Sequence, residues 1–360
     1  MSPTATAPGK IVLLGEYAVL DGAPALVAAV DRRVRVTVSS ADRFSIRAPE
    51  IRVDEATFEL SVVREDACVH WSDTVSTSAR ERLAFLAACL RDVALQTGSL
   101  PPVEIVVDSR AMTLSRGGPK LGIGSSAAVS VATVAALLAH AEDGIGLEQR
   151  QRTFDLARGA HARAQGGVGS GIDVAAATFG GLLRYERPAD GAAPVCDLLD
   201  PPSWLDPICV WSGRPASTRQ RIESVAELTR REPDVYRRLM AELGAASAAG
   251  CVALSDDAPQ RFFAAVRASY QALEKIGAAA DVDIVSAEHC RVADVVGSRG
   301  GVYKPSGAGG GDLGLAFAAS AEDRSGLQSA VEEAGFRIVA IELGGPGVEA
   351  EIEAEIEGAE

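Results

Sequence analysis

The sequence predicts an α+β protein built from two domains. The chain has 360 residues, which is long for a single domain. Apolar residues make up 47% and charged residues 23% of the chain, as in globular proteins. Stretches with the patterns of strands and of helices alternate, and a segment rich in Pro, Ala, Gly and Asp at residues 187–203 separates two halves. We therefore expect domains at residues 1–195 and 196–360.

The first half is expected to begin with strands and to continue with helices. Short apolar runs around the turn at Asp21-Gly22 predict an antiparallel meander over residues 10–40. Residues 77–97 have apolar positions spaced by about 3.6 residues, which predicts an amphipathic helix. The other elements expected here are a strand at 101–109, helices at 127–140, 147–164 and 170–179, and a strand at 181–186.

The second half is expected to form a second layered unit of strands and helices. Its acidic end, EAEIEAEIEGAE, is expected to be solvated, and we assign it no function. The elements expected here are strands at 207–212, 313–320 and 336–343, and helices within 216–249, 258–275, 282–298 and 323–335.

Charge and cysteine content narrow the classes of partner. A net charge of −14 repels nucleic acids and anionic lipids. The six cysteines are scattered, which favours reduced thiols over disulfides or zinc. The run IVLLGEYAVL is broken by Glu16, and the apolar run from Ala127 to Ala141 is too short to span a bilayer. We expect a cytoplasmic protein with small-molecule substrates and with neither nucleic-acid nor membrane partners, and a homodimer remains open.

The few lysines are concentrated in unusual places. Only Lys10, Lys120, Lys275 and Lys304 occur among the 35 basic residues, and all but Lys275 fall in glycine-rich motifs. In so acidic a chain, a site for an anion needs local positive charge. A compact ammonium is not interchangeable with a guanidinium near phosphate.

The stretch KLGIGSSAA, residues 120–128, has the features of an anion-binding loop. Gly122 and Gly124 let the backbone approach a ligand, and the amides and dipole of the following helix favour negative charge. One of Ser125 and Ser126 can cap the helix, while the other reaches phosphate or Mg²⁺. The stretch matches neither the Walker loop nor the Rossmann turn. A capped core helix is the alternative.

Three further segments carry candidate chemistry. In APGKIVLLGEYAVLDG, residues 7–22, a turn delivers Lys10 to the start of a strand, and Glu16 interrupts an apolar run at a cost unless it faces a polar site. In GVGSGIDVAAATFGG, Asp173 lies in the first turn of a helix, where an ordinary helix-terminal acid would also fit. In YKPSGAGGGDLGLAF, residues 303–317, five glycines surround an Asp, which favours a loop that wraps a ligand.

Taken together and in this order, the four segments resemble the motifs of the GHMP kinases. The resemblance covers most of the chain, with motifs at 7–22, 120–130 and 304–312. It implies an N-terminal domain like domain 2 of ribosomal protein S5 and a ferredoxin-like α/β sandwich as the C-terminal domain. It also implies transfer of a phosphoryl group from ATP, with Mg²⁺, to a small molecule.

Within the family, GEYAVL, KLGIGSSAA, VGSGIDVAAA and KPSGAGGGD are most similar to phosphomevalonate kinases. The implied reaction is ATP-dependent phosphorylation of (R)-5-phosphomevalonate to (R)-5-diphosphomevalonate in the mevalonate pathway of isoprenoid biosynthesis. Mevalonate kinase is the alternative, but the Glu that binds Mg²⁺ in those enzymes falls on Ala162 here. A sugar or homoserine acceptor, or a non-catalytic regulator with this fold, also remains open.

The resemblance implies roles for individual residues. Asp173 would accept a proton from, or orient, the attacking oxygen, and Lys10 would neutralise the transferring group. Ser126 would also meet Mg²⁺. The expected nucleotide-binding residues are Lys120, Gly122, Ile123, Gly124, Ser125, Ser126 and Ala127. The expected substrate-binding residues are Lys10, Tyr17, His161, Ser170, Ser217, Ser306, Gly307, Ala308 and Gly309. Further candidates for the acidic groups of the substrate are Arg116, Arg184, Thr218 and Lys304.

Overall fold

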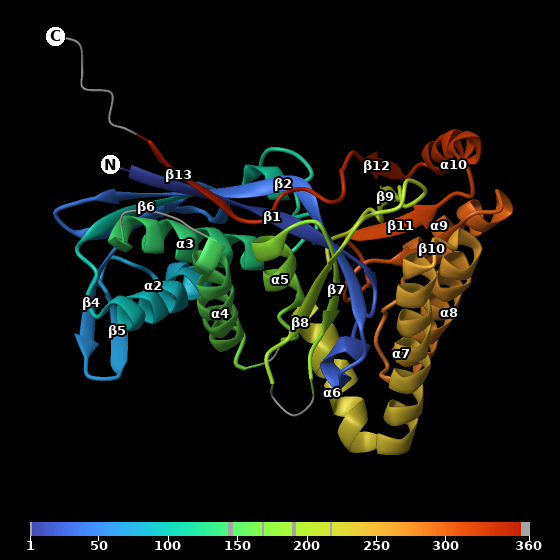
Figure 1. Ribbon diagram of the computed structural model, residues 1–360, viewed down its shortest axis with the longest axis horizontal. Coiled ribbons are helices and arrows are strands. Elements are labelled where there is room, and N and C mark those ends of the chain that lie inside the picture. The colour runs from blue at the N-terminus through green and yellow to red at the C-terminus, as the bar shows by residue number, and fades with distance from the viewer. Residues whose placement is uncertain (1, 143–146, 168, 189–191, 217, 354–360) are drawn as a thin grey trace, which may run out of the picture.

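The computed structural model describes residues 2–142, 147–167, 169–188, 192–216 and 218–353. Within them the chain forms a nine-stranded sheet and a four-stranded sheet, each packed against helices (Figure 1). The predicted α+β class is therefore confirmed.

The larger sheet carries the N-terminal motif. Its strands follow the order β13-β1-β2-β6-β3-β4-β5, and β7 pairs with both β2 and β8. Apart from the parallel pair β3 and β6, the described pairs in this sheet are antiparallel. Its strands are β1 (Ser2–Leu14), β2 (Ala25–Ser40), β3 (Phe44–Ala48), β4 (Val53–Val63), β5 (Asp66–Trp71), β6 (Val103–Asp108), β7 (Leu182–Glu186), β8 (Val195–Leu199) and β13 (Glu349–Glu353).

Helices cover one face of this sheet, and the other face is open (Figure 1). The alternation along β1 sets the two faces, because Ala5 and Ala7 are fully buried while Thr6 points the opposite way. Among the described helices, α3 is long and apolar enough to cross a membrane, but 67% of it is buried inside the fold. The helices of this layer are α1 (Thr77–Arg82), α2 (Ala84–Thr97), α3 (Ser125–Glu142), α4 (Leu147–Ala164) and α5 (Ile172–Phe179).

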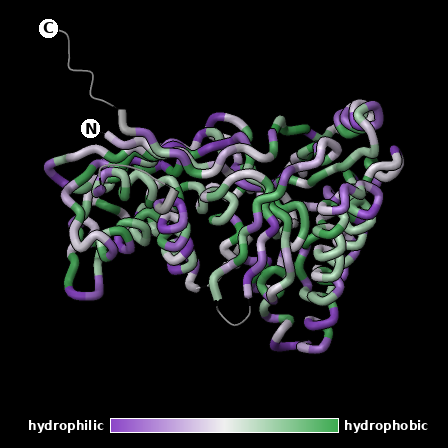
Figure 2. The backbone as a smooth tube through the Cα atoms, viewed as in Figure 1, coloured by the Kyte–Doolittle hydropathy of each residue, from purple (hydrophilic) through white to green (hydrophobic). Residues whose placement is uncertain are grey.

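The smaller sheet has the antiparallel order β10-β11-β9-β12. Its strands are β9 (Ile208–Trp211), β10 (Val302–Pro305), β11 (Leu313–Phe317) and β12 (Arg337–Val339). Both faces of β9, β10 and β11 are buried, and one face packs on Val292, Val296, Leu327 and Val331 of the helices of this half. Figure 2 shows hydrophobic and hydrophilic residues alternating along the helices of this half. The helices of this half are α6 (Thr218–Arg231), α7 (Pro233–Ser255), α8 (Pro259–Ala279), α9 (Ala287–Ser298) and α10 (Ala321–Glu333).

Several element boundaries differ from those expected. The first strand ends at Leu14, because the chain turns at Tyr17 (φ 56°) into a 3₁₀ turn, Ala18–Asp21. The two strands expected over residues 25–40 are one long strand, which pairs with β1 on both sides of an irregularity between Ala29 and Arg33. The helix expected at 77–97 is divided at Leu83.

The sequence prediction also contains no strand at the positions of β3, β4, β5 and β10. The long helical region expected at 216–249 is two helices, because Pro233 starts a new one. By contrast, the described bounds of α4 agree with the helix predicted at 147–164.

Part of the acidic C-terminal segment, whose residues 354–360 lie outside the described part of the chain, forms a strand that the sequence did not predict. Residues Glu349–Glu353 form β13, which pairs with the edge strand β1. The edge backbone of β1 supplies hydrogen-bonding groups, and Glu349 lies 2.9 Å from Arg33 on β2. The end of the second half therefore returns to the larger sheet. The division into domains 1–195 and 196–360 remains a prediction.

Candidate active site

The loop before α3 forms a set of free backbone donors. The glycines of residues 122–124 adopt positive φ, which side chains disfavour. Helix α3 begins at Ser125, and its first intrahelical bond runs from the Ala128 amide to the Gly124 carbonyl at 3.1 Å. The amides of residues 125–127 precede that bond and, with the helix dipole, favour an anion. We call residues 120–127 the phosphate loop.

Lys10 and Asp173 both lie against this loop. The Lys10 amide donates to the Ile123 carbonyl at 2.8 Å, which joins β1 to the loop. A Cβ atom on Gly124 would lie 3.1 Å from Lys10 Cγ, 3.2 Å from Lys10 Cε and 3.7 Å from Asp173 Cβ. Among the described residues, no carboxylate oxygen lies within 4.0 Å of the Lys10 ammonium. Its charge is therefore available to a ligand.

A buried imidazole connects Ser126 to Asp173. The Ser126 hydroxyl lies 3.1 Å from His161 Nε2, and the same nitrogen lies 4.0 Å from Asp173 Oδ2. His161 is 4% exposed and packs on the Phe85 ring, with centroids 4.9 Å apart. The predicted site residues Ser126, His161 and Asp173 thus lie close together, and the buried His161 ring is adjacent to the other two side chains.

A cleft of about 1220 Å³ opens beside the phosphate loop. Apolar side chains of α2 and β6 form part of its wall, including Phe85 and Val106, and Ser125 and Ser126 lie on its lining. The cations that line it are Arg52, Arg82, Arg110, Arg116 and Lys120. It is large enough for a nucleotide, and its cations suit an anionic one.

The glycine-rich segment, residues 306–311, approaches Lys10 from the other half of the chain. A Cβ atom on Gly307 would lie 3.7 Å from Lys10 Nζ. The Ser306 hydroxyl donates to the Val12 carbonyl at 3.0 Å and accepts from the Val12 amide at 3.1 Å. The predicted residue Ser306 therefore joins this segment to β1.

Tyr17 and Ala308 form another contact between the halves. The Tyr17 hydroxyl donates to the Ala308 carbonyl at 2.7 Å, and burial raises the pKa of this phenol well above its ordinary value. Gly309 packs on the Ile284 carbonyl, which would lie 2.3 Å from a Cβ atom there. Tyr17 and Ala308 thus belong to a buried apolar cluster between the halves, and a substrate contact of Tyr17, Ala308 or Gly309 remains a prediction.

The remaining predicted residues lie in different settings. Ser170 precedes α5, where its hydroxyl accepts from the Ile172 amide at 3.3 Å. Arg184 pairs with Glu186 at 2.9 Å and with Asp197 at 3.1 Å, so its charge is compensated. Ser217 lies outside the described residues.

Lys304 corrects an expectation. Its side chain is fully buried, its ammonium pairs with Glu16, and it donates to the Pro305 carbonyl at 2.6 Å. Burial lowers the pKa of Lys304 and the nearby Lys10 charge acts in the same direction, while Glu16 opposes both. Lys304 therefore does not contact a substrate, and Glu16 faces neither water nor an open site.

Two residues near the site were not predicted. Asp312 directs its carboxylate at Gly122, and burial raises the pKa of that carboxyl to about 6 against the effects of Lys10 and Arg221. Arg221 on α6 is 9% exposed and packs on Gly310. The one sequence signal for Asp312 is an acid among glycines, whereas Arg221 lies in a helix with no motif.

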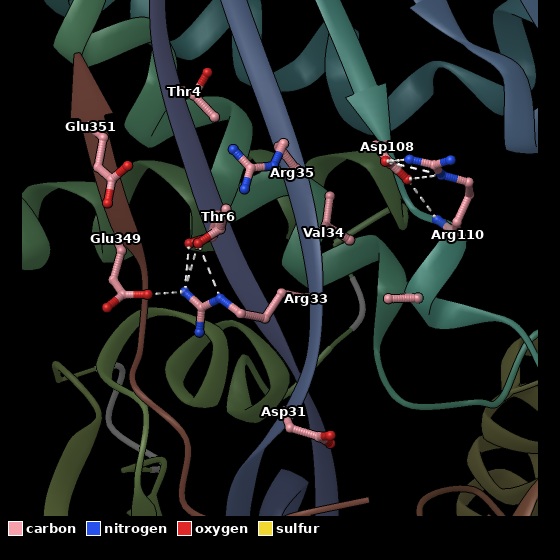
Figure 3. Close-up of a pocket in the computed structure, with 11 residues that line it drawn as sticks. Thr4, Thr6, Asp31, Arg33, Val34, Arg35, Asp108, Arg110, Glu349 and Glu351 are labelled. Atoms are coloured by element: carbon pink, nitrogen blue, oxygen red, sulfur yellow. Dashed lines mark hydrogen bonds and ion pairs between the residues drawn. The ribbon is translucent and has the colours of Figure 1, made fainter. Parts of the chain in front are cut away.

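A second hollow, of about 540 Å³, lies on the open face of the larger sheet (Figure 3). Its arginine Arg33 is held by Thr6 and by Glu349, and Arg110 at its other end is paired with Asp108. These cations are already neutralised, and the hollow contains none of the predicted site residues. It shares Asp108 and Arg110 with the cleft, but no residue of the phosphate loop lines it.

The donor set of the site suits a nucleotide-bound cation. Among the described residues, no group of three or more His, Cys, Asp or Glu side chains could hold a metal ion. Ser126 and Asp173 supply one hydroxyl and one carboxylate close to the free amides of α3. Mg²⁺ commonly takes one or two protein ligands and completes its shell with phosphate oxygens and water. The residues therefore fit Mg²⁺ carried by a nucleotide.

Comparison with known proteins indicates the family of this chain. Residues 84–181 match the family model of the GHMP kinases N terminal domain. The chain is 32% identical over 339 residues to a phosphomevalonate kinase of Streptomyces sp. (strain CL190), covering 86% of this chain and 88% of that protein. It is 30% identical over 243 residues to a mevalonate kinase of Archaeoglobus fulgidus, covering 68% of this chain and 70% of that protein.

A solved structure shows the same fold. The Streptococcus pneumoniae phosphomevalonate kinase in complex with phosphomevalonate and AMPPNP aligns with a TM-score of 0.75 at 20% identity. The alignment covers 94% of this chain and 99% of that one.

Proposed function

This chain belongs to the GHMP kinases, and we propose that it transfers the γ-phosphoryl group of ATP to the phosphate of (R)-5-phosphomevalonate. The family makes it a phosphotransferase, and its relatives act in the mevalonate pathway. The acceptor is inferred from the 32% identity over 339 residues to the phosphomevalonate kinase relative and from the lack of a Glu at Ala162.

One observation carries the proposal: Lys10 and Asp173 flank Gly124 at the start of α3. A phosphate held by the amides of α3 would lie near the Lys10 ammonium and near the Asp173 carboxylate. Phosphoryl transfer needs this combination, because positioning and charge neutralisation supply most of the catalysis. A protein that only binds a nucleotide gains nothing from an acid and a free ammonium at this point.

The residues divide the reaction between them. A phosphate oxygen of the acceptor attacks the γ-phosphorus, the bond from that phosphorus to the β,γ-bridging oxygen breaks, and ADP leaves with the bridging oxygen. Lys10 neutralises charge that develops on the transferring group. The second pKa of a phosphate monoester is about 6, so the acceptor is largely dianionic at neutral pH. Asp173 therefore orients the attacking oxygen and takes up any proton that remains on it.

The phosphate loop and its cleft would hold ATP. The amides of residues 125–127 would bind its phosphates, and the cleft lined by Phe85 and Lys120 would take the nucleoside. Ser126 and Asp173 would hold Mg²⁺ together with the nucleotide. When bound, Mg²⁺ neutralises phosphate charge during transfer. His161 would hold the Ser126 hydroxyl in place through the hydrogen bond to its Nε2 atom.

Acceptor preference tests the proposal. ADP release with Mg·ATP should be much faster with 5-phosphomevalonate than with mevalonate at equal concentrations, with Asp173→Asn as the background control. Preference for mevalonate would overturn the assignment of the acceptor and leave the kinase site intact. If neither compound supports ADP release, a sugar or homoserine acceptor and a binding-only protein become the readings to test.

Ser126→Ala tests the proposed metal contact. The variant loses the hydroxyl, and apparent affinity for Mg²⁺ in the presence of ATP should fall by about 10- to 100-fold, as is typical for groups that support metal sites. Initial rates as a function of Mg²⁺ at fixed ATP measure this change. Ser125→Ala, one residue earlier, is the matched control and should shift the Mg²⁺ dependence far less. Equal behaviour of the two variants would remove Ser126 from the metal site.

A further inference from the structure

Asp312 meets the phosphate loop directly, although the two are far apart in sequence. A Cβ atom on Gly122 would lie 2.3 Å from Asp312 Oδ2 and 2.6 Å from both Cβ and Cγ of Asp312. Real Cβ atoms do not approach other atoms so closely. The Asp312 side chain therefore fills the space in front of Gly122, and the loop needs glycine there.

Asp312 is held firmly from its own half of the chain. Its Oδ1 accepts from the Ala216 amide at 3.1 Å, and its carbonyl accepts from the Ser212 amide at 2.9 Å. Its own amide donates to the Arg214 carbonyl at 2.8 Å. Its φ of 55° lies in the left-handed region, which Asp and Asn tolerate better than most residues. These bonds hold the Asp312 carboxyl group in one position against the phosphate loop.

Three segments converge on this side chain. They are the phosphate loop at Gly122, the glycine-rich segment that ends beside Asp312, and the loop at residues 212–216 that leads into α6. Lys10 and Arg221 are close enough for their charges to act on the carboxyl group. The contact therefore lies between the segment that would hold ATP and the segments of the other half that face it.

We propose that Asp312 is a positioning residue for phosphoryl transfer, which acts through its contact with Gly122. The contact sets the separation between the phosphate loop and the glycine-rich segment, and so the distance between the γ-phosphate and the acceptor. This inference rests on the proposed kinase function but not on the identity of the acceptor. Shape, rather than charge, is the property of Asp312 that matters.

The contact between Asp312 and Gly122 can be altered by substituting either residue. Asp312→Gly removes the side chain that contacts Gly122, and glycine tolerates the positive φ at this position. The kcat should then fall by about 10-fold or more, with nucleotide binding little changed. Asp312→Asn keeps the volume and the acceptor for the Ala216 amide, so it should retain most of the kcat that Asp312→Gly loses. Gly122→Ala should also lose kcat, because its Cβ atom would collide with Asp312.

The double variant Gly122→Ala/Asp312→Gly provides the decisive comparison. Removing the carboxyl group makes room for the added methyl group, so the double variant should exceed Gly122→Ala in kcat by about 10-fold. Such a coupling is within the range found for residues in contact. Gly98→Ala controls for backbone strain, since Gly98 has a similar φ of 77° and no atom within 4 Å of a Cβ there.

The assay uses the full chain with whichever acceptor gives turnover, together with binding of a fluorescent ATP analogue. Thermal unfolding shows which variants fold. If Gly122→Ala does not fold, the comparison of kcat between Asp312→Gly and Asp312→Asn still tests the proposal. The proposal is overturned if Asp312→Gly keeps wild-type kcat, if Asp312→Asn loses as much as Asp312→Gly, or if the double variant shows no recovery. A wild-type chain with no kinase activity would instead contradict the proposed function.

Discussion

Asp173→Asn is expected to lower kcat by about 10²- to 10⁴-fold while Mg·ATP binding stays close to that of the wild type. The amide keeps the size of the side chain and can still accept from the Val174 amide, a bond of 3.1 Å in the structure. It cannot take up a proton, and it loses the charge that would orient the attacking oxygen, while Ser126 and the nucleotide phosphates would still hold Mg²⁺. With a dianionic phosphate acceptor the loss should lie toward the lower end of that range.

The measurement is steady-state turnover together with binding of a fluorescent ATP analogue. Asp155→Asn is the matched control, because Asp155 is an exposed acid on α4 that accepts a Gln151 side-chain bond of 3.2 Å. It should leave both quantities unchanged. Wild-type turnover in Asp173→Asn would show that Asp173 has no part in the chemistry, whereas loss of nucleotide binding alone would make it a binding residue.

Lys304→Met is expected to destabilise the fold by about 3–5 kcal/mol, because it leaves the Glu16 carboxylate buried without its cation. The Glu16 and Lys304 side chains are 2% and 0% exposed, and the second carboxylate oxygen of Glu16 has no hydrogen-bond partner among the described residues. The pair joins the loop after β1 to β10 of the smaller sheet, so its loss affects both halves of the chain.

Guanidinium unfolding measures this effect against two controls. Lys275→Met breaks an ion pair with Glu242 whose side chains are 57% and 39% exposed, and it should cost at most about 1 kcal/mol. The double variant Glu16→Gln/Lys304→Met removes both charges and should be more stable than Lys304→Met alone. Equal unfolding midpoints for Lys304→Met and Lys275→Met would mean that the buried pair contributes no more than a surface pair.

Local patterns predicted much of the fold. The helix at 147–164 and the strand at 181–186 have strong periodicity and clear ends, and the structure has α4 and β7 there. The strands β3 to β5 also carry a signal, since Ala56, Phe58 and Leu60 alternate with polar residues. The pairing of β13 with β1 could not be predicted, because an edge backbone attracts a strand whatever its charge.

Part of the candidate site could likewise be predicted from local patterns, and part of it could not. The phosphate loop could be named from its glycine spacing and helix start, because those signals are local. The roles of Lys10 and Asp173 came from the resemblance of the combined motifs to the GHMP kinases. The burial of Lys304 against Glu16 and the contact of Asp312 with Gly122 join segments separated by 288 and by 190 residues. No periodicity within one segment reports such pairings. The charge of Lys304 therefore suggested contact with a substrate, whereas in the structure it pairs with the Glu16 side chain.

The identity of the phosphorylated product tests the central claim most directly. Phosphorus NMR of the products from Mg·ATP and 5-phosphomevalonate distinguishes a new diphosphate, with two coupled resonances, from a phosphate monoester, with one. We predict a diphosphate ester that forms in step with ADP. Formation of a monoester from mevalonate, with no reaction of 5-phosphomevalonate, would contradict the account and make the chain a kinase of an alcohol acceptor.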